Sequence, residues 1–164
     1  MIVQLQHVAY DPRVRGLCLR PYPGHPRGCP NFKLKAGCPP YAPLLDAVLC
    51  GASPVWAIIN EFDLAAHVAR LRARHPGWSD RQLRCCLYWQ GTARRQLEAA
   101  IAAFKAAHPE CVVARCPEAL GVDVTATLRA AGVDLEWPPV RIVRQVALAG
   151  VAAAAGAARS AEVT

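Results

Sequence analysis

Residues 18–40 read CLRPYPGHPRGCPNFKLKAGCPP, and this stretch decides how the rest of the chain must be organised. It carries three cysteines, Cys18, Cys29 and Cys38, in a segment otherwise rich in proline, glycine and basic residues. Such a composition suits neither a helix nor a strand, because proline removes a backbone donor and glycine has no side chain to pack. Thiolates around a metal ion or an iron–sulfur cluster are therefore the leading candidates for holding the loop together.

The segments around this loop carry ordinary secondary-structure signals. Residues 2–10 alternate apolar and polar positions, which predicts a strand, and the loop then runs over residues 11–40. Pro39-Pro40 suits the first turn of a helix, so we expect a helix over residues 41–49. Residues 54–61 form a short apolar run that predicts a buried strand.

Helix and strand signals continue through the second half of the chain. Asp63 can cap a helix that ends near residue 75. Ser79 and Gln82 form a capping box, which predicts the start of a long helix ending at residue 108. A strand, a helix and a strand follow, over residues 111–115, 121–132 and 140–148.

This order of elements predicts an α+β or α/β fold. We expect about four strands in one sheet, with helices packed on it and a long N-terminal cysteine-rich metal loop. A single globular domain is predicted over residues 1–149. Residues 150–164 form an alanine-rich tail that we expect to be a frayed helix or disordered.

Charge and hydropathy limit the class of protein. The formal net charge of +7 permits an anionic small molecule or a nucleic acid as partner, although scattered arginines also suit an ordinary solvated surface. No run of about 18 strongly apolar residues predicts a membrane span, and the first residues lack the pattern of a secretory signal. We therefore expect a cytoplasmic protein without a membrane partner. In that compartment the eight cysteines are predicted to be ligands, reactive thiols or small buried groups.

The spacing of the cysteines favours a cluster over zinc. Ten residues separate Cys18 from Cys29 and eight separate Cys29 from Cys38, whereas zinc motifs supply ligands in pairs about two to four residues apart. Iron–sulfur clusters accept irregular spacing, and Cys29, Cys38 and Cys116 each precede a proline, as in the bacterial ferredoxin run that ends Cys-Pro. The sequence thus predicts a cluster of the 4Fe–4S type, with zinc as the alternative and no metal as the third possibility.

The fourth ligand is open at this stage. Cys116 is the first choice because it shares the Cys-Pro context and follows a predicted strand. His25 in the loop is a further candidate metal ligand, and Cys50 and Cys111 are others. If only three thiolates bind, one iron is left open to a substrate or to exogenous sulfur.

Two short motifs resemble a known family. They are Cys38-Pro-Pro before a predicted helix, and Cys116-Pro-Glu-Ala-Leu-Gly-Val-Asp-Val followed by Thr127 and Ala131-Gly132. Together they resemble a family of uncharacterised cysteine-rich proteins described as predicted metal-binding, which look like cytosolic iron–sulfur proteins. The resemblance implies that Cys38 and Cys116 bind the cluster, and it implies no reaction.

Residues outside the cysteine motifs suggest weaker alternatives. The basic residues among the cysteines could lower thiolate pKa values or bind an anionic substrate. Tyr88-Trp89, beside Cys85 and Cys86 on a predicted helix, could stack a nucleic-acid base or simply pack in the core. Glu61, which follows a predicted strand, could serve as a general acid or base. The basic residues in question are Arg20, Arg27, Lys33 and Lys35.

Three functions remain open from the sequence. The leading one is a cytoplasmic iron–sulfur protein, compatible with an electron-transfer partner, that performs redox or sulfur chemistry on a small or nucleotide-like anion. The alternative is a zinc-stapled nucleic-acid-binding module, and the third is a structural domain with inert thiols. The sequence has no glycine-rich phosphate loop, nucleophile elbow or HExxH motif, which argues against nucleotide hydrolysis, esterase and zinc peptidase chemistry. The predicted cluster ligands are Cys18, Cys29, Cys38 and Cys116.

Overall fold

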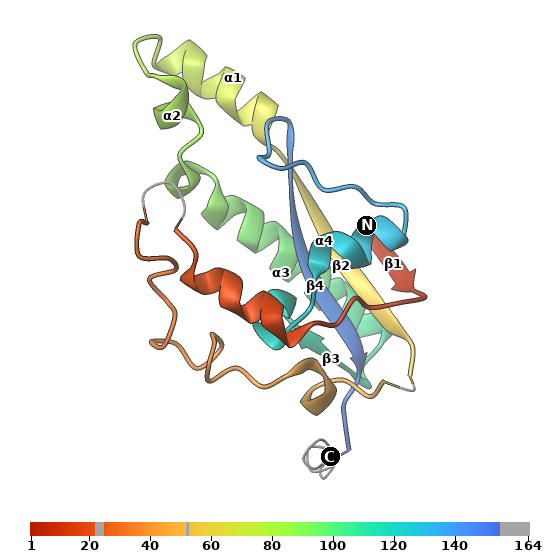
Figure 1. Cartoon of the computed structure of the whole chain (residues 1–164). Coiled ribbons are helices and arrows are strands. Elements are labelled where there is room, and N and C mark those ends of the chain that lie inside the picture. Colours follow the sequence, from red (N-terminus) through yellow and green to blue (C-terminus); the bar gives the residue numbers. More distant parts are fainter. Residues whose placement is uncertain (22–24, 52, 155–164) are drawn as a thin grey trace.

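The computed structural model describes residues 1–21, 25–51 and 53–154 and shows an α+β fold (Figure 1). The strands are β1 (Ile2–Leu5), β2 (Val55–Asp63), β3 (Cys111–Ala114) and β4 (Ile142–Val151). The α-helices are α1 (Leu64–Arg74), α2 (Asp80–Leu83), α3 (Gln90–Ala107) and α4 (Val124–Ala130). Short 3-10 helices are η1 (Pro12–Leu19), η2 (Leu45–Ala47), η3 (Cys86–Tyr88) and η4 (Pro117–Leu120).

One antiparallel sheet forms the centre of the molecule, with strand order β1-β2-β4-β3. The long central pair runs in register from Val55 opposite Gly150 to Asp63 opposite Ile142. In β2, Ala57, Ile58 and Ile59 are at most 1% exposed, so the strand is covered on both faces. A strand buried on both faces reads as a continuous apolar run, which is the pattern that predicted it.

Successive residues of the central strands pack into different cores. Ile58 contacts the α3 side chains Leu97, Ile101 and Phe104, behind the sheet in Figure 1. Its neighbour Ile59 packs with residues of η4 and α4 on the opposite face. Because side chains alternate across a strand, the two cores are separated by the sheet itself.

The predicted strands at 54–61, 111–115 and 140–148 are confirmed as β2, β3 and β4. The predicted cap is also confirmed, since the Asp63 carboxylate accepts a hydrogen bond from the Ala66 amide at 2.7 Å at the start of α1. The strand predicted over 2–10 is shorter, because β1 ends at Leu5. Strand β4 extends to Val151, so the predicted tail begins within the sheet; residues 155–164 lie outside the described residues.

The helix predicted over residues 41–49 is wrong. Only the three residues of η2 are helical there, in 3-10 geometry. Pro43 lies inside the predicted span, and the residue before a proline avoids the helical backbone conformation. Helical backbone is therefore disfavoured at Ala42, and no regular helix continues from Pro39-Pro40.

The long helix predicted from Ser79 to residue 108 is broken in two. The capping box at Ser79 and Gln82 is present, yet α2 ends at Leu83 and α3 begins at Gln90. The predicted helix over 121–132 is similarly shortened to α4, and Gly132 follows it in a left-handed conformation, with a φ of 76°.

No helix in the described part of the chain is both long enough and apolar enough to cross a membrane.

His67 on α1 provides a test of the packing at this end of the sheet. It is 9% exposed, its ring lies against Phe62, and its Nε2 has no hydrogen-bond partner among the described residues. Burial, followed by the nearby charge of Arg70, lowers the pKa of His67. In the unfolded chain His67 binds a proton with a pKa of about 6.5, whereas in the folded chain it binds that proton only at a lower pH.

We therefore expect the free energy of unfolding to fall as the pH drops below about 6.5. Replacing His67 with phenylalanine should flatten this dependence, because phenylalanine does not titrate. Urea unfolding of both proteins between neutral and mildly acidic pH measures the effect. Equal pH slopes for the two proteins would contradict it.

Candidate functional site

Helix η1 carries Cys18 and begins at a side-chain cap, where the Asp11 carboxylate accepts from the Arg13 amide at 2.9 Å. Its C-terminal end is joined directly to the second cysteine, since the Cys29 amide donates to the Cys18 carbonyl at 2.8 Å. Gly28 allows this approach. It has a φ of 82°, and a Cβ atom there would lie 2.5 Å from the Cys18 oxygen. Two cysteines eleven positions apart are thus held side by side through their backbones.

The third cysteine is tied to the same helix. The Arg15 guanidinium on η1 donates to the carbonyls of Pro40 and Ala42, at 3.0 and 2.8 Å. Within the loop, the Lys33 amide donates to the Pro39 carbonyl at 3.0 Å, which closes the turn before Cys38. These contacts replace the packing that a helix over this segment would have provided.

Cys116 comes from the other half of the chain and lies between β3 and η4. Helix η4, which begins directly after Cys116, contacts η1, the helix that carries Cys18. Backbone hydrogen bonds hold the two segments together, from the Asp11 amide to the Gly121 carbonyl at 2.7 Å and from the Asp123 amide to the Ala9 carbonyl at 2.8 Å. Cys116 therefore reaches the site through the sheet and not through the loop.

Electrostatic effects connect the four predicted ligands through Cys18 and Cys38. Burial raises the pKa of the Cys18 thiol, and the charges of Cys29, Cys38 and Glu118 and a hydrogen bond with Cys29 raise it further. Loss of contact with water raises the pKa of Cys116, with added contributions from Glu118 and Cys38 and opposing ones from two arginines. Cys38 acts on both of the other thiols, so the set is continuous across the two halves of the chain.

Sequence reasoning missed Glu118. Its carboxyl group raises the pKa of both Cys18 and Cys116, and its own pKa is raised by loss of contact with water. A signal for it existed in the Cys116-Pro-Glu sequence, which places the residue two positions after a predicted ligand.

Two arginines beside Cys116 were also missed. The positive charges of Arg94 and Arg115 lower the pKa of Cys116, against the larger effects that raise it. Arg115 forms a bidentate ion pair with Glu98, in which Nε and Nη2 donate to the two carboxylate oxygens at 2.7 and 3.0 Å. Arg94, on α3, has no ion pair among the described residues and is exposed. No local sequence signal distinguishes Arg94 from the many other arginines of the chain.

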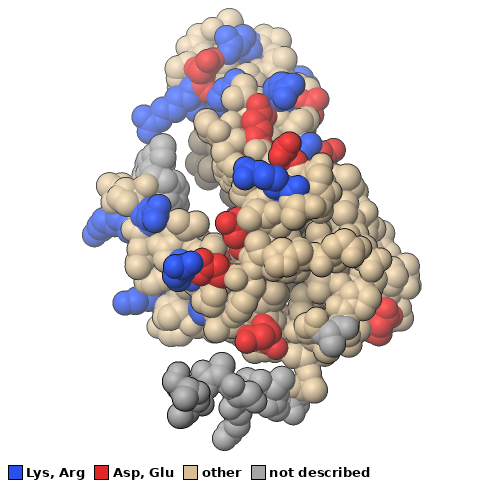
Figure 2. Space-filling view, turned by 45° about the vertical axis from the view of Figure 1, so that its right-hand side comes forward, with Lys and Arg blue, Asp and Glu red and all other residues tan. Residues whose placement is uncertain are grey.

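The loop around the cysteines is strongly basic. Residues 12–45 contain six cationic side chains and no aspartate or glutamate. Figure 2 shows basic side chains standing out at the left of the view, on the part beside the grey residues. The six are Arg13, Arg15, Arg20, Arg27, Lys33 and Lys35.

The remaining cysteines have other surroundings. Among the described residues no two cysteines form a disulfide. Cys111 is 2% exposed in the core under α3, and burial raises its pKa, so it acts as a small packing residue. Cys50 lines a separate hollow of about 660 Å³. His25 is exposed in the loop, and its role as a ligand stays a prediction.

In the described ranges, no three histidine, cysteine, aspartate or glutamate side chains are grouped closely enough to hold a single metal ion. A polynuclear cluster places its own iron and sulfide atoms between the ligands, so its thiolates do not have to converge on one point.

The Tyr88-Trp89 pair is split, which corrects its placement on a helix. Trp89 stacks on Phe62 in the core, with ring centroids 5.6 Å apart. Tyr88 instead stacks on Trp78, with centroids 5.2 Å apart, and remains 52% exposed. The two rings therefore do not form one stacking platform for a base.

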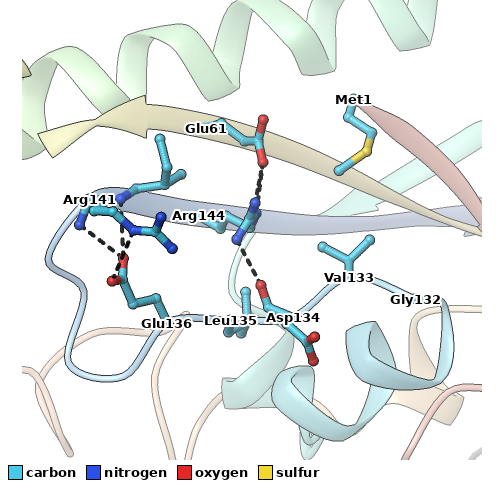
Figure 3. Close-up of a pocket in the computed structure, with 10 residues that line it drawn as sticks. Met1, Glu61, Gly132, Val133, Asp134, Leu135, Glu136, Arg141 and Arg144 are labelled. Atoms are coloured by element: carbon cyan, nitrogen blue, oxygen red, sulfur yellow. Dashed lines mark hydrogen bonds and ion pairs between the residues drawn. The ribbon is translucent and has the colours of Figure 1, made fainter. Parts of the chain in front are cut away.

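Glu61 lines a hollow of about 500 Å³ at another edge of the sheet (Figure 3). Its carboxylate accepts from the Arg144 Nε at 2.8 Å, and a second guanidinium nitrogen lies 2.6 Å away. Arg144 also donates to the Asp134 carbonyl at 2.7 Å. This arrangement gives Glu61 a structural role, because it holds Arg144 between the sheet and the segment after α4.

Comparison of the chain with protein-family models, curated proteins and solved structures found no match. The resemblance to the metal-binding family therefore stays a prediction that depends on the two short motifs.

Gly121 lies where the segment that follows Cys116 packs closely against the start of η1. It has a φ of 91°, and a Cβ atom would lie 3.1 Å from the Pro12 Cα and 3.2 Å from the Tyr10 ring. We expect Gly121→Ala to cost about 1–2 kcal/mol from the left-handed backbone and about 1–3 kcal/mol more from the overlap. Urea unfolding and the rate of Cys18 labelling measure the loosening.

Gly132→Ala is the matched control. Its φ is 76°, but no atom lies within 4 Å of the added Cβ, so only the backbone term applies. Equal losses of stability in the two variants would show that the contact with Pro12 and Tyr10 does not hold η1 in place.

Proposed function

We propose that this chain binds an iron–sulfur cluster, of the 4Fe–4S type, through Cys18, Cys29, Cys38 and Cys116. The observation that carries the proposal is the electrostatic effect of Cys38, in the loop, on both Cys18 and Cys116, which comes from the end of β3. Thiols from separate segments, three of them followed by proline, form a donor set suited to a cluster.

The charges around the thiols support the same proposal. Cys18 and Cys116 are surrounded by other acidic groups, so thiolates at this site repel one another. Iron bound between them would offset that repulsion, because a metal deprotonates the thiols that ligate it.

Arg94 supports a small or nucleotide-like anion as substrate. Its guanidinium acts on Cys116 and has no ion pair in the described ranges, so it remains available to an anion that approaches the thiols. A bound cluster would supply one-electron redox chemistry or, if one iron lacks a thiolate, a position for sulfur or substrate. We assign redox or sulfur chemistry on this basis, and a reducing cytoplasm as the compartment that keeps eight thiols free.

Protein purified without oxygen should contain iron and acid-labile sulfide in similar amounts and show visible charge-transfer absorption. Cys116→Ser should lose most of the iron, because it removes the thiol that the sheet supplies. Cys86→Ser is the matched control, since Cys86 is exposed in η3, and it should retain the iron.

Iron, zinc and sulfide analysis of the three proteins decides the matter. Colourless protein with one equivalent of zinc would replace the cluster with the zinc alternative. Metal-free protein that folds normally, with no difference among the variants, would support inert thiols instead.

A further inference from the structure

The outer surface of the cysteine loop has a composition that a solvated loop does not require. Four of its cations, Arg20, Arg27, Lys33 and Lys35, are exposed and form no ion pair among the described residues. No acidic residue lies between Asp11 and Asp46 to balance them. A surface with charge of one sign and no internal partner attracts groups of the opposite sign.

Apolar side chains stand out between these cations. Leu17 is 52%, Leu19 57% and Leu34 78% exposed. Leu17 and Leu19 flank Cys18 in the sequence, and Leu34 lies in the turn before Cys38, so each exposed leucine is close along the chain to a proposed ligand. Single exposed apolar residues are ordinary, but three of them around one site, between unpaired cations, match the mixed composition of a docking surface.

The segments that carry these side chains are held together. A Cβ atom on Gly28 would lie 3.0 Å from the Leu19 carbonyl carbon. The segment that carries Arg27 therefore runs beside the segment that carries Leu19. The turn that displays Lys33, Leu34 and Lys35 is closed by backbone bonds to Asn31, Cys38 and Pro39. The surface is thus ordered by the same contacts that bring the thiols together.

We propose that the described part of this loop, residues 12–21 and 25–45, is the docking surface for a small acidic protein that functions as an electron carrier. Carboxylates on such a partner complement the unpaired cations, and an apolar centre on it covers the leucines. A protein fits better than a nucleic acid because the exposed apolar groups are leucines, which do not stack bases. The choice of partner rests on the proposed function, because a carrier needs a redox site beneath the surface.

The test uses the full chain, purified without oxygen, and a plant-type ferredoxin as the acidic probe. Titration by calorimetry or by amide shifts should show binding that weakens as salt increases. Lys33→Glu combined with Lys35→Glu should weaken binding by about tenfold or more, through a loss of charge complementarity. Arg70→Glu combined with Arg74→Glu makes the same change in net charge on α1, away from the loop in Figure 1, and should change binding by about twofold at most.

A second pair of variants tests the apolar contact. Leu34→Ser should weaken binding, whereas Leu87→Ser, at a residue 84% exposed beyond α2, should not. Neither leucine is buried, so both variants should fold. Equal effects within either pair, no binding of the ferredoxin, or binding that does not respond to salt would overturn the proposal.

Two further measurements separate this inference from the proposed function. Iron and sulfide content is determined on the same samples, so a chain that binds the probe without iron supports the docking surface and contradicts the cluster. A single-stranded oligonucleotide of mixed sequence is titrated in parallel. If the lysine variants weaken oligonucleotide binding while the ferredoxin does not bind, the docking proposal is overturned in favour of a nucleic acid.

Discussion

The site depends on the backbone pairing of residues 9–11 with residues 121–123. Ala9 and Asp11 exchange hydrogen bonds with Asp123 and Gly121, and the buried Thr127 hydroxyl accepts the Ala9 amide at 3.0 Å. This pairing fixes the start of η1 against the start of α4. Helix η1 carries Cys18, and Cys116 lies directly before η4, the short helix that precedes α4. The same backbone bonds therefore hold together the two segments that carry these cysteines. Buried backbone groups must find partners, which makes the pairing strongly favoured.

Charges of both signs act on the thiols. Besides burial, Glu118 and the other cysteines raise the pKa of Cys18 and Cys116, while Arg94 on α3 and Arg115 after β3 lower the pKa of Cys116. The loop carries six cations with no acidic residue among them. A surface with charge of this one sign suits an anionic partner. The other charged hollow differs, because Arg144 and Glu61 there neutralise each other.

The prediction of the fold succeeded where the signal is local and failed where tertiary contacts override it. Apolar runs identified β2, β3 and β4, and the caps at Asp63 and Ser79 are present. The helix after Pro39-Pro40 did not form, because Pro43 disfavours helical backbone at Ala42. The long helix is interrupted between α2 and α3, where Trp89 packs on Phe62, a contact with a residue distant in the sequence that no local pattern records.

The sequence by itself predicted a donor set. Three cysteines followed by proline, and the lack of close cysteine pairs, predicted Cys18, Cys29, Cys38 and Cys116, because residue type and spacing are local properties. Only the tertiary structure decided that the charge of Cys38 acts on both Cys18 and Cys116, and that Glu118 and Arg94 act on Cys116. Those contacts cross the sheet and connect η1, η4 and α3. Distances between segments far apart in the chain follow from packing and from backbone pairing, and no local pattern records them.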